Sequence, residues 1–528
     1  MKKWLDRVTG LVTMYSLVLA ALITITLVAL VLPVLDQLSG SPGSQFAHPP
    51  LALIVSAAVA VGSAVGSSWL FAKIARITPH TQSALITGML IFFVMDPRFL
   101  LPEGGVDWLS LGVIALTGVV ASASKYLLAV RGRHIFNPAA LGAFVVGVIV
   151  VVSGISNTGL FPSAAGWWVG TPTLLIPVAI GAFFVLYRTQ RLTMGLTFVA
   201  VAVASVLVQT LLKGGDIGGS LSTALLSTSI VFFAGFMLSE PLTLPPRRWQ
   251  QLLEAVVVAL LFTVYFNIAS VVTSSPQLAL LVGNLLAFGF GQRRGINLTY
   301  LGKKLIGPTT WELAFEPARP VRFLPGQYME LTIPHRKADF RGSRRYFSIS
   351  SAPGSDGPLT FALTLPDKSS SFKRALLDLE PGELVRGTSV GGDFALPKRI
   401  DEPLLLIAGG IGITPFASQL AAARATGEKR DVVVVYANSA QGALPYSELL
   451  QESGARVVVF GPKPSPLPKG WEYGGEGRVT PERLAELVPD ASTRRAYISG
   501  PPALVATLRT ALRGQGVRRV HADYFSGY

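Results

Sequence analysis

Gly409-Gly410-Ile411-Gly412-Ile413-Thr414-Pro415 decides the fold of the C-terminal part of this chain. The stretch follows the apolar residues 404–408 and precedes a segment with helical spacing. Glycines between a buried strand and a helix let a backbone or a ligand approach closely, and a helix N-terminus attracts a pyrophosphate. Further apolar stretches alternate with helical spacing in the same way: 431–436, 456–460 and 496–499. The pattern predicts a doubly wound α/β domain over residues 399–528.

The segment before this domain has the period of β-strands. Residues 325–331 and 359–364 alternate between apolar and polar side chains, which is typical of half-buried strands. We therefore expect a small antiparallel β-barrel over residues 296–398.

Together the two domains resemble the ferredoxin-NADP reductase superfamily. Its flavin motif reads Arg-x-Tyr-Ser, and Arg345-Tyr346-Phe347-Ser348 stands in that place with Phe for Tyr. The resemblance implies that these four residues bind FAD. The Arg345 guanidinium can form paired hydrogen bonds with a pyrophosphate. The Phe347 ring can stack on the isoalloxazine, and Ser348 can hydrogen-bond the reactive edge of the flavin as a catalytic group.

The same resemblance implies a nicotinamide nucleotide site in the α/β domain. Its cofactor-binding residues are then Gly409, Gly410, Gly412, Thr414, Pro415, Gly500 and Pro501. Ser499 stands where most relatives have Cys, and we expect it on the hydride path as a catalytic residue. Tyr528 supplies an aromatic ring that would cover the flavin until the nicotinamide displaces it.

Two further features bear on the nucleotides. Ser370 and Ser371 begin a helical run, and its N-terminal amides are expected to hold the flavin phosphates. Residues 437–440, after the second strand, contain no Lys or Arg that would bind a 2′-phosphate. This favours NADH and leaves NADPH as the alternative.

Residues 1–295 have a different character. Half of the whole chain is hydrophobic and only 14% is charged. The apolar residues gather in runs whose lengths are close to the roughly 20 residues that a membrane-spanning helix needs. About ten such runs are expected to be spans: 11–34, 50–71, 82–96, 107–128, 135–154, 171–187, 193–212, 222–239, 251–272 and 276–292. Lys and Arg gather in every second loop, whereas the alternate loops carry only Arg98 and Lys213. The positive-inside rule then predicts a multi-pass protein of the cytoplasmic membrane with both termini in the cytoplasm.

Two stretches of this membrane domain resemble each other. Residues 86–97 are similar to residues 232–241, and Asn137-Pro138 and Ser275-Pro276 open helices at matching places. A repeat of five spans has an odd number, so we expect the second copy to be inverted. The alternative is chance similarity between apolar helices, with Asn-Pro and Ser-Pro acting only as helix starts.

Residues 132–139 and 235–243 resemble stretches of the flavin-carrying membrane subunits of two enzymes, the sodium-translocating NADH:quinone oxidoreductase and the Rnf complex. The resemblance covers roughly residues 1–295. It implies a helical membrane domain that carries flavin, with one FMN joined to a threonine through its phosphate. Arg133 and Asn137 are then expected beside a further flavin.

The FMN attachment motif of that family reads like Ser-Gly-Ala-Thr. Residues 220–223 stand in its place, although Leu221 and Ser222 depart from it. The resemblance therefore implies covalent FMN at Thr223, which the charge pattern places on the outer side of the membrane. The alternative is that these Ser and Thr residues only cap a helix.

These features predict a membrane flavoprotein oxidoreductase. It would take hydride from cytoplasmic NAD(P)H onto FAD and pass electrons through membrane-bound flavin to a quinone or an extracytoplasmic flavoprotein.

The chain has no cysteine, which excludes thiolate-ligated clusters, and its five histidines form no stacked pair of haem ligands within a span. The net charge of +15 follows the ends of apolar runs, so we expect a lipid bilayer and neither nucleic acid nor a metal. An ion-translocating redox pump subunit and a transporter with a redox-sensing reductase domain are the alternatives.

Overall fold

The computed structural model describes most of the chain: residues 14–39, 48–75, 79–97, 99–100, 104–130, 133–154, 167–268, 272–291, 295–335, 343–354, 357–365, 369–388, 390–439, 442–463 and 467–524. The chain divides into two compact units, of which the first is residues 7–293 and the second is residues 294–528 with residues 1–6.

The first unit is built from apolar helices. They are α2 (Met14–Ser39), α3 (Pro50–Ile74), α4 (Thr81–Val94), α5 (Trp108–Leu127), α6 (Pro138–Val152), α7 (Pro172–Arg188), α8 (Leu192–Leu212), α9 (Ile217–Leu226), α10 (Ile230–Phe232), the π-helix η2 (Phe233–Met237), α11 (Arg248–Thr263) and α12 (Pro276–Phe290). Two short hairpins interrupt them, β1 (Ala129–Val130) with β2 (Arg133–His134) and β3 (Asn267–Ile268) with β4 (Val272–Thr273). Each of the ten expected apolar runs overlaps one of these helices, and run 222–239 overlaps the broken pair α9 and α10–η2.

Fewer of these helices than expected are long enough to cross a membrane. Among the described residues, α2, α3, α5 and α8 are, and the pair α9 and α10–η2, bent by 47°, would be a fifth if it is one span. The helices α4, α6, α7 and α12 are apolar but shorter. A helix rises about 1.5 Å per residue, so about 15 residues reach about 23 Å of the roughly 30 Å of hydrocarbon. By length, the described residues show four or five candidate spans, and the ten expected spans are not shown.

The ninth expected run is longer than the helix that it contains. Helix α11 ends at Thr263 because Val264 adopts an extended conformation. Residues of the β3–β4 hairpin, which the apolar count assigned to the span, then pair with each other. Valine, isoleucine and threonine favour strands as readily as membrane helices, so hydropathy alone does not separate the two.

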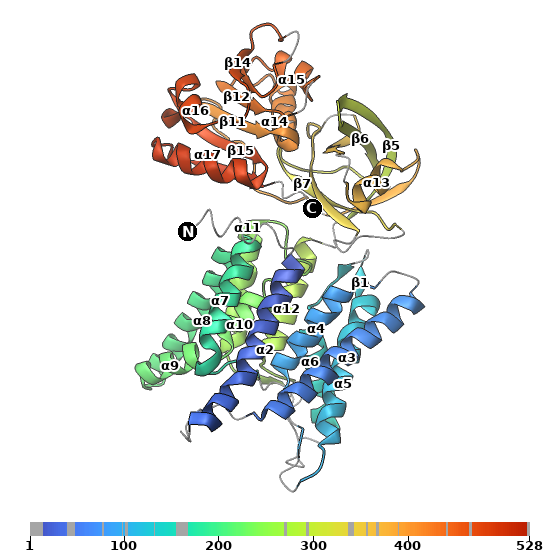
Figure 1. Ribbon diagram of the computed structural model, residues 1–528, viewed down its shortest axis with the longest axis vertical. Helices are drawn as coiled ribbons and strands as arrows, with labels where there is room; N and C mark the ends of the chain where they lie inside the picture. Colours follow the sequence, from blue (N-terminus) through green and yellow to red (C-terminus); the bar gives the residue numbers. More distant parts are fainter. Residues whose placement is uncertain are drawn as a thin grey trace. The chain divides into compact units, whose positions relative to one another are not determined.

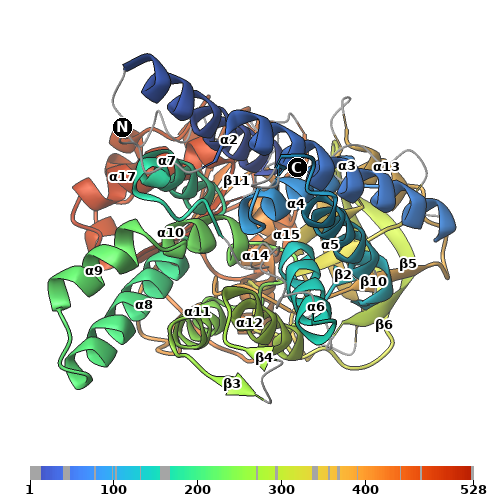
Figure 2. The same ribbon diagram turned by 90° about the horizontal axis from the view of Figure 1, so that it is seen from below.

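Packing partners recur between the two halves of this unit. Helix α3 packs against α4 and α5, and α5 packs against α6; in the second half α8 packs against α9 and α11, and α11 against α12. The pairs α2–α7 and α6–α12 join the halves. Figure 2 shows α12 between α11 and α6. The order of packing in α2–α6 therefore recurs in α7–α12, as an internal repeat requires.

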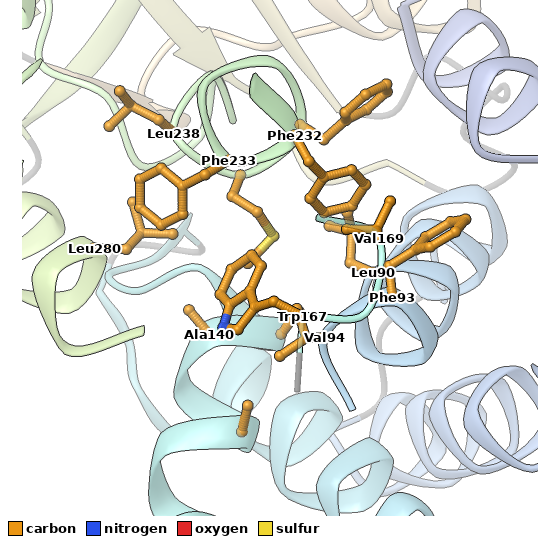
Figure 3. Close-up of a cluster of buried hydrophobic side chains, with 14 of the residues drawn as sticks. Leu90, Phe93, Val94, Ala140, Trp167, Val169, Phe232, Phe233, Leu238 and Leu280 are labelled. Carbon is orange, nitrogen blue, oxygen red and sulfur yellow. The ribbon is translucent and has the colours of Figure 1, made fainter. Parts of the chain in front are cut away.

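The halves also meet in an aromatic core. Phe93 of α4 lies 5.4 Å from Phe232 of α10 between ring centroids, and Trp167 lies 5.8 Å from Phe233. Figure 3 shows these side chains gathered with Leu90, Val94, Ala140, Val169, Leu238 and Leu280. The two stretches that resemble each other in sequence thus supply the centre of the unit.

The second unit begins with a six-stranded antiparallel sheet. Its strands are β5 (Ile296–Gly307), β6 (Thr310–Pro317), β7 (Tyr328–Thr332), β8 (Arg344–Ser348), β9 (Leu359–Thr364) and β10 (Leu384–Gly387), in the order β8-β7-β10-β5-β6-β9. Helix α13 (Ser371–Leu377) lies between β9 and β10 in the chain. The edges meet through one bridge between Ile349 and Phe361 and a hydrogen bond from Ser350 N to Thr360 O of 2.9 Å. The described residues show this single link, not a full closing ladder.

A six-stranded parallel sheet follows. Its elements are β11 (Leu404–Gly409), the 3₁₀-helix η4 (Gly410–Ile413), α14 (Thr414–Ala425), β12 (Val432–Ala437), α15 (Ser447–Glu452), β13 (Arg456–Phe460), β14 (Glu472–Gly475), α16 (Pro481–Leu487), β15 (Arg495–Gly500), α17 (Pro502–Gly514) and β16 (Val520–Tyr524). The strand order is β14-β13-β12-β11-β15-β16. The expected strands are present, and β14 and β16 are additional edge strands.

Successive side chains of β11 point to opposite faces of this sheet and pack in two different cores. Leu404 and Leu406 pack with Phe416 of α14 in one core. Leu405 and Ile407 pack with residues of α16 and α17 in the other, namely Leu484, Val505, Leu508 and Leu512. Figure 1 shows α14 and α15 on one side of the sheet and α16 and α17 on the other. The predicted doubly wound arrangement is confirmed in this domain.

Candidate functional site

The glycine turn lies where the strand order reverses, between β11 and β15. A Cβ atom on Gly412 would collide with the carbonyl oxygen of Ser499 and stand 2.8 Å from Gly500 Cα. A Cβ atom on Gly409 would stand 2.9 Å from Pro501 Cδ. These glycines therefore let the turn pack directly on the end of β15. In open α/β sheets this crevice beyond the carboxyl ends of the strands is where ligands bind.

Gly410 has a different role from its neighbours. Its φ of +54° is in the left-handed region, and a Cβ atom there would have no atom within 4 Å. The backbone of the turn is thus open to a ligand at Gly410. Thr414 is buried, and its hydroxyl donates to Ile411 O at 3.0 Å, so it holds the turn in shape. Pro415 stands in the first turn of α14, where its missing N–H costs nothing.

Ser499 is fully buried beside this turn. Its hydroxyl oxygen has no hydrogen-bond partner among the described residues. Leaving a buried hydroxyl unpaired costs about 1–3 kcal/mol, so such groups call for an explanation. A nicotinamide amide in the crevice would supply a partner. The glycine cradle and this hydroxyl both fit the nucleotide that the sequence predicts.

Strand β8 carries the flavin motif, and only one of the four motif side chains is exposed. Arg345, Phe347 and Ser348 are buried, whereas Tyr346 is 54% exposed. The Phe347 ring stacks on Phe372 of α13 with centroids 6.0 Å apart, and it belongs to the core of the sheet. This differs from the expectation that Phe347 presents its ring to the isoalloxazine. The exposed ring on the strand is Tyr346, which makes an edge contact with Tyr328 at 5.3 Å.

The start of α13 meets Arg345. The Arg345 guanidinium lies 5.3 Å from the centre of the Phe372 ring. Ser370 caps the helix by accepting from Lys373 N at 3.3 Å, so the helix begins where the sequence predicts. An arginine beside the first turn of a helix suits a phosphate group.

His335 is a site residue that the sequence did not reveal. Its Nδ1 lies 2.9 Å from Ile333 O, and its Nε2 lies 3.0 Å from the hydroxyl of Ser371. A carbonyl only accepts, so Nδ1 carries the proton and Nε2 of the neutral ring accepts from Ser371. His335 thereby fixes the first residue of α13. Its sequence signal, a lone His after Pro334, is too weak to predict this contact.

Hydrogen bonds join the two domains of the second unit. The Tyr446 hydroxyl donates to Glu312 Oε1 at 2.9 Å, and Ser350 donates to the same oxygen at 3.3 Å. Ser418 of α14 donates to Ser351 O at 2.7 Å. Burial and the Glu312 carboxylate raise the pKa of Tyr446 well above its ordinary value, so Tyr446 stays a donor. The antiparallel sheet and the α/β domain are thus fixed against each other near Ser348.

The two family-like motifs of the first unit meet in the structure. Arg133 donates to Leu242 O at 2.9 Å, and His134 Nε2 lies 2.9 Å from Glu240 Oε1. Asn137 caps α6 by accepting from Ala140 N and donates to Met237 O at 3.4 Å. Arg133 and Asn137 therefore anchor one half of the unit on the other. Asn137 has the N-cap role of the simpler interpretation and a cross-half contact besides.

Thr223 lies exposed inside α9. The cap of that helix is Asp216, which accepts from Gly218 N and Gly219 N, so the alternative of a Ser/Thr cap is wrong here. Tyr528 lies outside the described residues.

Known proteins resemble the C-terminal part of the chain. The profile of the family described as the oxidoreductase NAD-binding domain matches residues 406–510. The ferredoxin reductase component of 3-ketosteroid-9-alpha-monooxygenase from Mycolicibacterium smegmatis is 29% identical over 213 residues, covering 39% of this chain and 56% of that protein. A flavohemoprotein from Bacillus cereus is 28% identical over 214 residues, covering 38% of this chain and 52% of that protein. The chain spans about half the length of these curated relatives.

A solved structure is also similar. The flavohem-like FAD/NAD-binding domain of nitric oxide dioxygenase from Vibrio cholerae has 20% identity and a TM-score of 0.38, over 44% of this chain and 99% of that one. The family profile thus identifies an oxidoreductase NAD-binding domain in the C-terminal unit, and the curated relatives show that this unit resembles the FAD/NAD modules of ferredoxin-reductase-type oxidoreductases.

Proposed function

We propose that the protein is a membrane flavoprotein oxidoreductase. It takes hydride from cytoplasmic NAD(P)H to FAD and delivers electrons, through flavin held by the membrane domain, to a quinone or an extracytoplasmic flavoprotein. The observation that carries the proposal is the glycine turn packed on β15 beside the unpaired hydroxyl of Ser499. FAD, when bound, accepts a hydride and can release its electrons one at a time.

The reductase residues then have distinct tasks. Gly410 leaves the turn open for the pyrophosphate of the nucleotide, and the N-terminus of α14 attracts its charge. Ser499 orients the nicotinamide through its hydroxyl. Arg345 binds the flavin pyrophosphate, and Ser348 positions the flavin edge. The Tyr446–Glu312 hydrogen bond holds the two sites at a fixed separation.

The membrane part of the proposal rests on apolarity and charge. Four helices are long and apolar enough to cross a membrane, and four shorter ones are also apolar. Lys and Arg lie in alternate loops, which supports a multi-pass arrangement with both termini in the cytoplasm. Arg133 and Asn137 stand where a further flavin is expected, and exposed Thr223 is accessible to an FMN transferase.

Membrane vesicles of opposite orientation test the proposal. NADH does not cross a bilayer, so we expect NADH oxidation with inverted vesicles and none with sealed right-side-out vesicles. An Arg345→Ala variant, purified until its FAD is lost, is the control for background activity. Equal activity in both kinds of vesicle would overturn the orientation, and activity found entirely outside the membrane fraction would overturn the membrane location. A quinone analogue and an artificial acceptor compared on the same vesicles separate the acceptor from the NADH reaction.

A further inference from the structure

A buried carboxyl group in the first unit has no role in the electron path. Glu254 of α11 is 0% exposed, and neither of its carboxyl oxygens has a hydrogen-bond partner among the described residues. Its Oε1 lies 3.3 Å from the position that a Cβ atom on Gly283 would occupy, so the carboxyl points at the backbone of α12. The buried residues of the two helices are mostly small and apolar, among them Ala255, Val258, Ala259, Leu280 and Ala287, with Gln250, Gln277 and Asn284 as the other buried polar ones.

The polar groups that face Glu254 do not neutralise it. Helix α11 packs mainly against α8 and α12. On α12 the amide of Asn284 is turned toward the carboxyl, but its Nδ2 completes no hydrogen bond of ordinary geometry. At the start of α8, Arg191 acts on Glu254 electrostatically, yet no Lys, Arg or His among the described residues forms an ion pair with it. An ionised carboxylate without a close partner in such a place is strongly unfavourable, because burial removes its hydration.

A proton removes this cost more simply than a metal ion does. Cations such as Ca²⁺ take about six to eight oxygen ligands, whereas a proton needs one oxygen. No cluster of three or more His, Asp or Glu side chains lies within the described part of the chain. We propose that Glu254 is a proton-binding site and carries its proton as a neutral carboxylic acid in the resting protein.

The site is connected to the cross-half contact of Asn137. Asn284 accepts from the backbone N–H of Asn137 at 2.7 Å, and Asn137 caps α6. Glu254 is thus separated from the α6 N-terminus by one side chain. A negative charge placed on an electron carrier beside Asn137 would strengthen proton binding at Glu254. This second statement rests on the proposed function, whereas the resting proton does not.

Infrared spectroscopy of the full-length protein tests the resting proton. A protonated carboxyl gives a carbonyl stretching band above the amide region, and the band shifts to lower frequency in D₂O. We expect that band in the wild type and its loss in Glu254→Gln. The matched control is Asp107→Asn, because Asp107 is also buried but accepts from Ser110 N at 2.9 Å and from the Ser110 hydroxyl at 2.6 Å. That variant should keep the band.

Other outcomes overturn the inference. A wild type without the band, or a band that persists in Glu254→Gln, means that Glu254 is ionised or bound to a cation. If Glu254→Gln does not fold, Glu254→Asp shortens the side chain while keeping the acid, and its band should move in frequency; an unmoved band would contradict the assignment. Reduction of the protein by NADH should shift the Glu254 band. A resting band without that shift keeps the proton site and overturns its link to the electron carrier.

Discussion

Gly412 packs directly on the carbonyl oxygen of Ser499, so that no side chain can be placed between η4 and β15. The contact joins the two segments that form the predicted nucleotide site. It also explains why the third glycine of the turn is needed even though its φ is not left-handed.

Replacing Gly412 with Ala should therefore disrupt the nucleotide site. The added methyl group must push η4 away from β15. Overpacking of this kind destabilises a folded site by about 1–3 kcal/mol. We expect the KM for NADH to rise about tenfold or more, with FAD content unchanged, in steady-state assays. Gly514→Ala is the matched control, since a Cβ atom there meets nothing within 4 Å. Equal behaviour of the two variants would contradict the close packing.

Arg345 should govern retention of FAD. Its guanidinium lies over the ring of Phe372 in the first turn of α13. Charge-assisted hydrogen bonds contribute about 1.5–3 kcal/mol, so Arg345→Ala should weaken FAD binding roughly ten- to hundredfold. Flavin absorbance per protein after gel filtration measures the loss. Arg399→Ala, which removes an exposed ion pair with Asp401 in the same unit, should keep its flavin.

Replacing Ser499 with Ala should raise the stability of the nucleotide-free protein and lower the rate of hydride transfer. Ser499→Ala removes a buried hydroxyl that has no partner among the described residues, so the nucleotide-free protein should become more stable by up to about 1 kcal/mol. Loss of the contact with the nicotinamide should slow hydride transfer about tenfold, for the loss of about 1.4 kcal/mol. Thermal unfolding and stopped-flow flavin reduction measure the two effects. A slower reaction without the gain in stability would mean that the hydroxyl already has a partner.

Much of the C-terminal unit could be predicted from the sequence, because β11 and β12 are apolar runs buried on both faces, and β13 and β15 are buried after their first residue. The edge strand β16 could not, since His521 and Asp523 interrupt its pattern. The exposure of Phe347 also differs from the prediction: alternation along β8 shows which residues share a face, but not which face α13 covers. In the first unit, hydropathy located the helices but could not give their lengths. Contacts between distant residues, such as His335 with Ser371, leave no local signal.

The Tyr446–Glu312 hydrogen bond should stabilise the second unit in a pH-dependent way. Burial and Glu312 raise the folded-state pKa of Tyr446 above the ordinary value near 10. A group with a raised pKa gives stability that is fully present below its unfolded pKa and is lost as pH rises beyond it. The wild type should therefore be more stable than Tyr446→Phe by about 1 kcal/mol at pH 8, and its advantage should shrink above about pH 10. Denaturant unfolding at a series of pH values measures this, and Glu312→Gln tests the coupling. A constant difference across the series would exclude the tyrosine as its source.

Thr223 should carry covalent FMN if the membrane domain works as proposed. Its side chain is exposed on α9, three residues before that helix ends at Leu226, so a transferase could reach it. Protein denatured and run on a gel should then fluoresce as flavin, and Thr223→Ala should lose that band while keeping the FAD released from the reductase. Thr171→Ala is the matched control, because Thr171 lies in the same unit but is half-buried, with its hydroxyl 3.1 Å from that of Thr173. Fluorescence lost in the control instead would move the attachment to Thr171. Absence of fluorescence in wild-type protein, expressed with an active FMN transferase, would remove covalent flavin from the electron path.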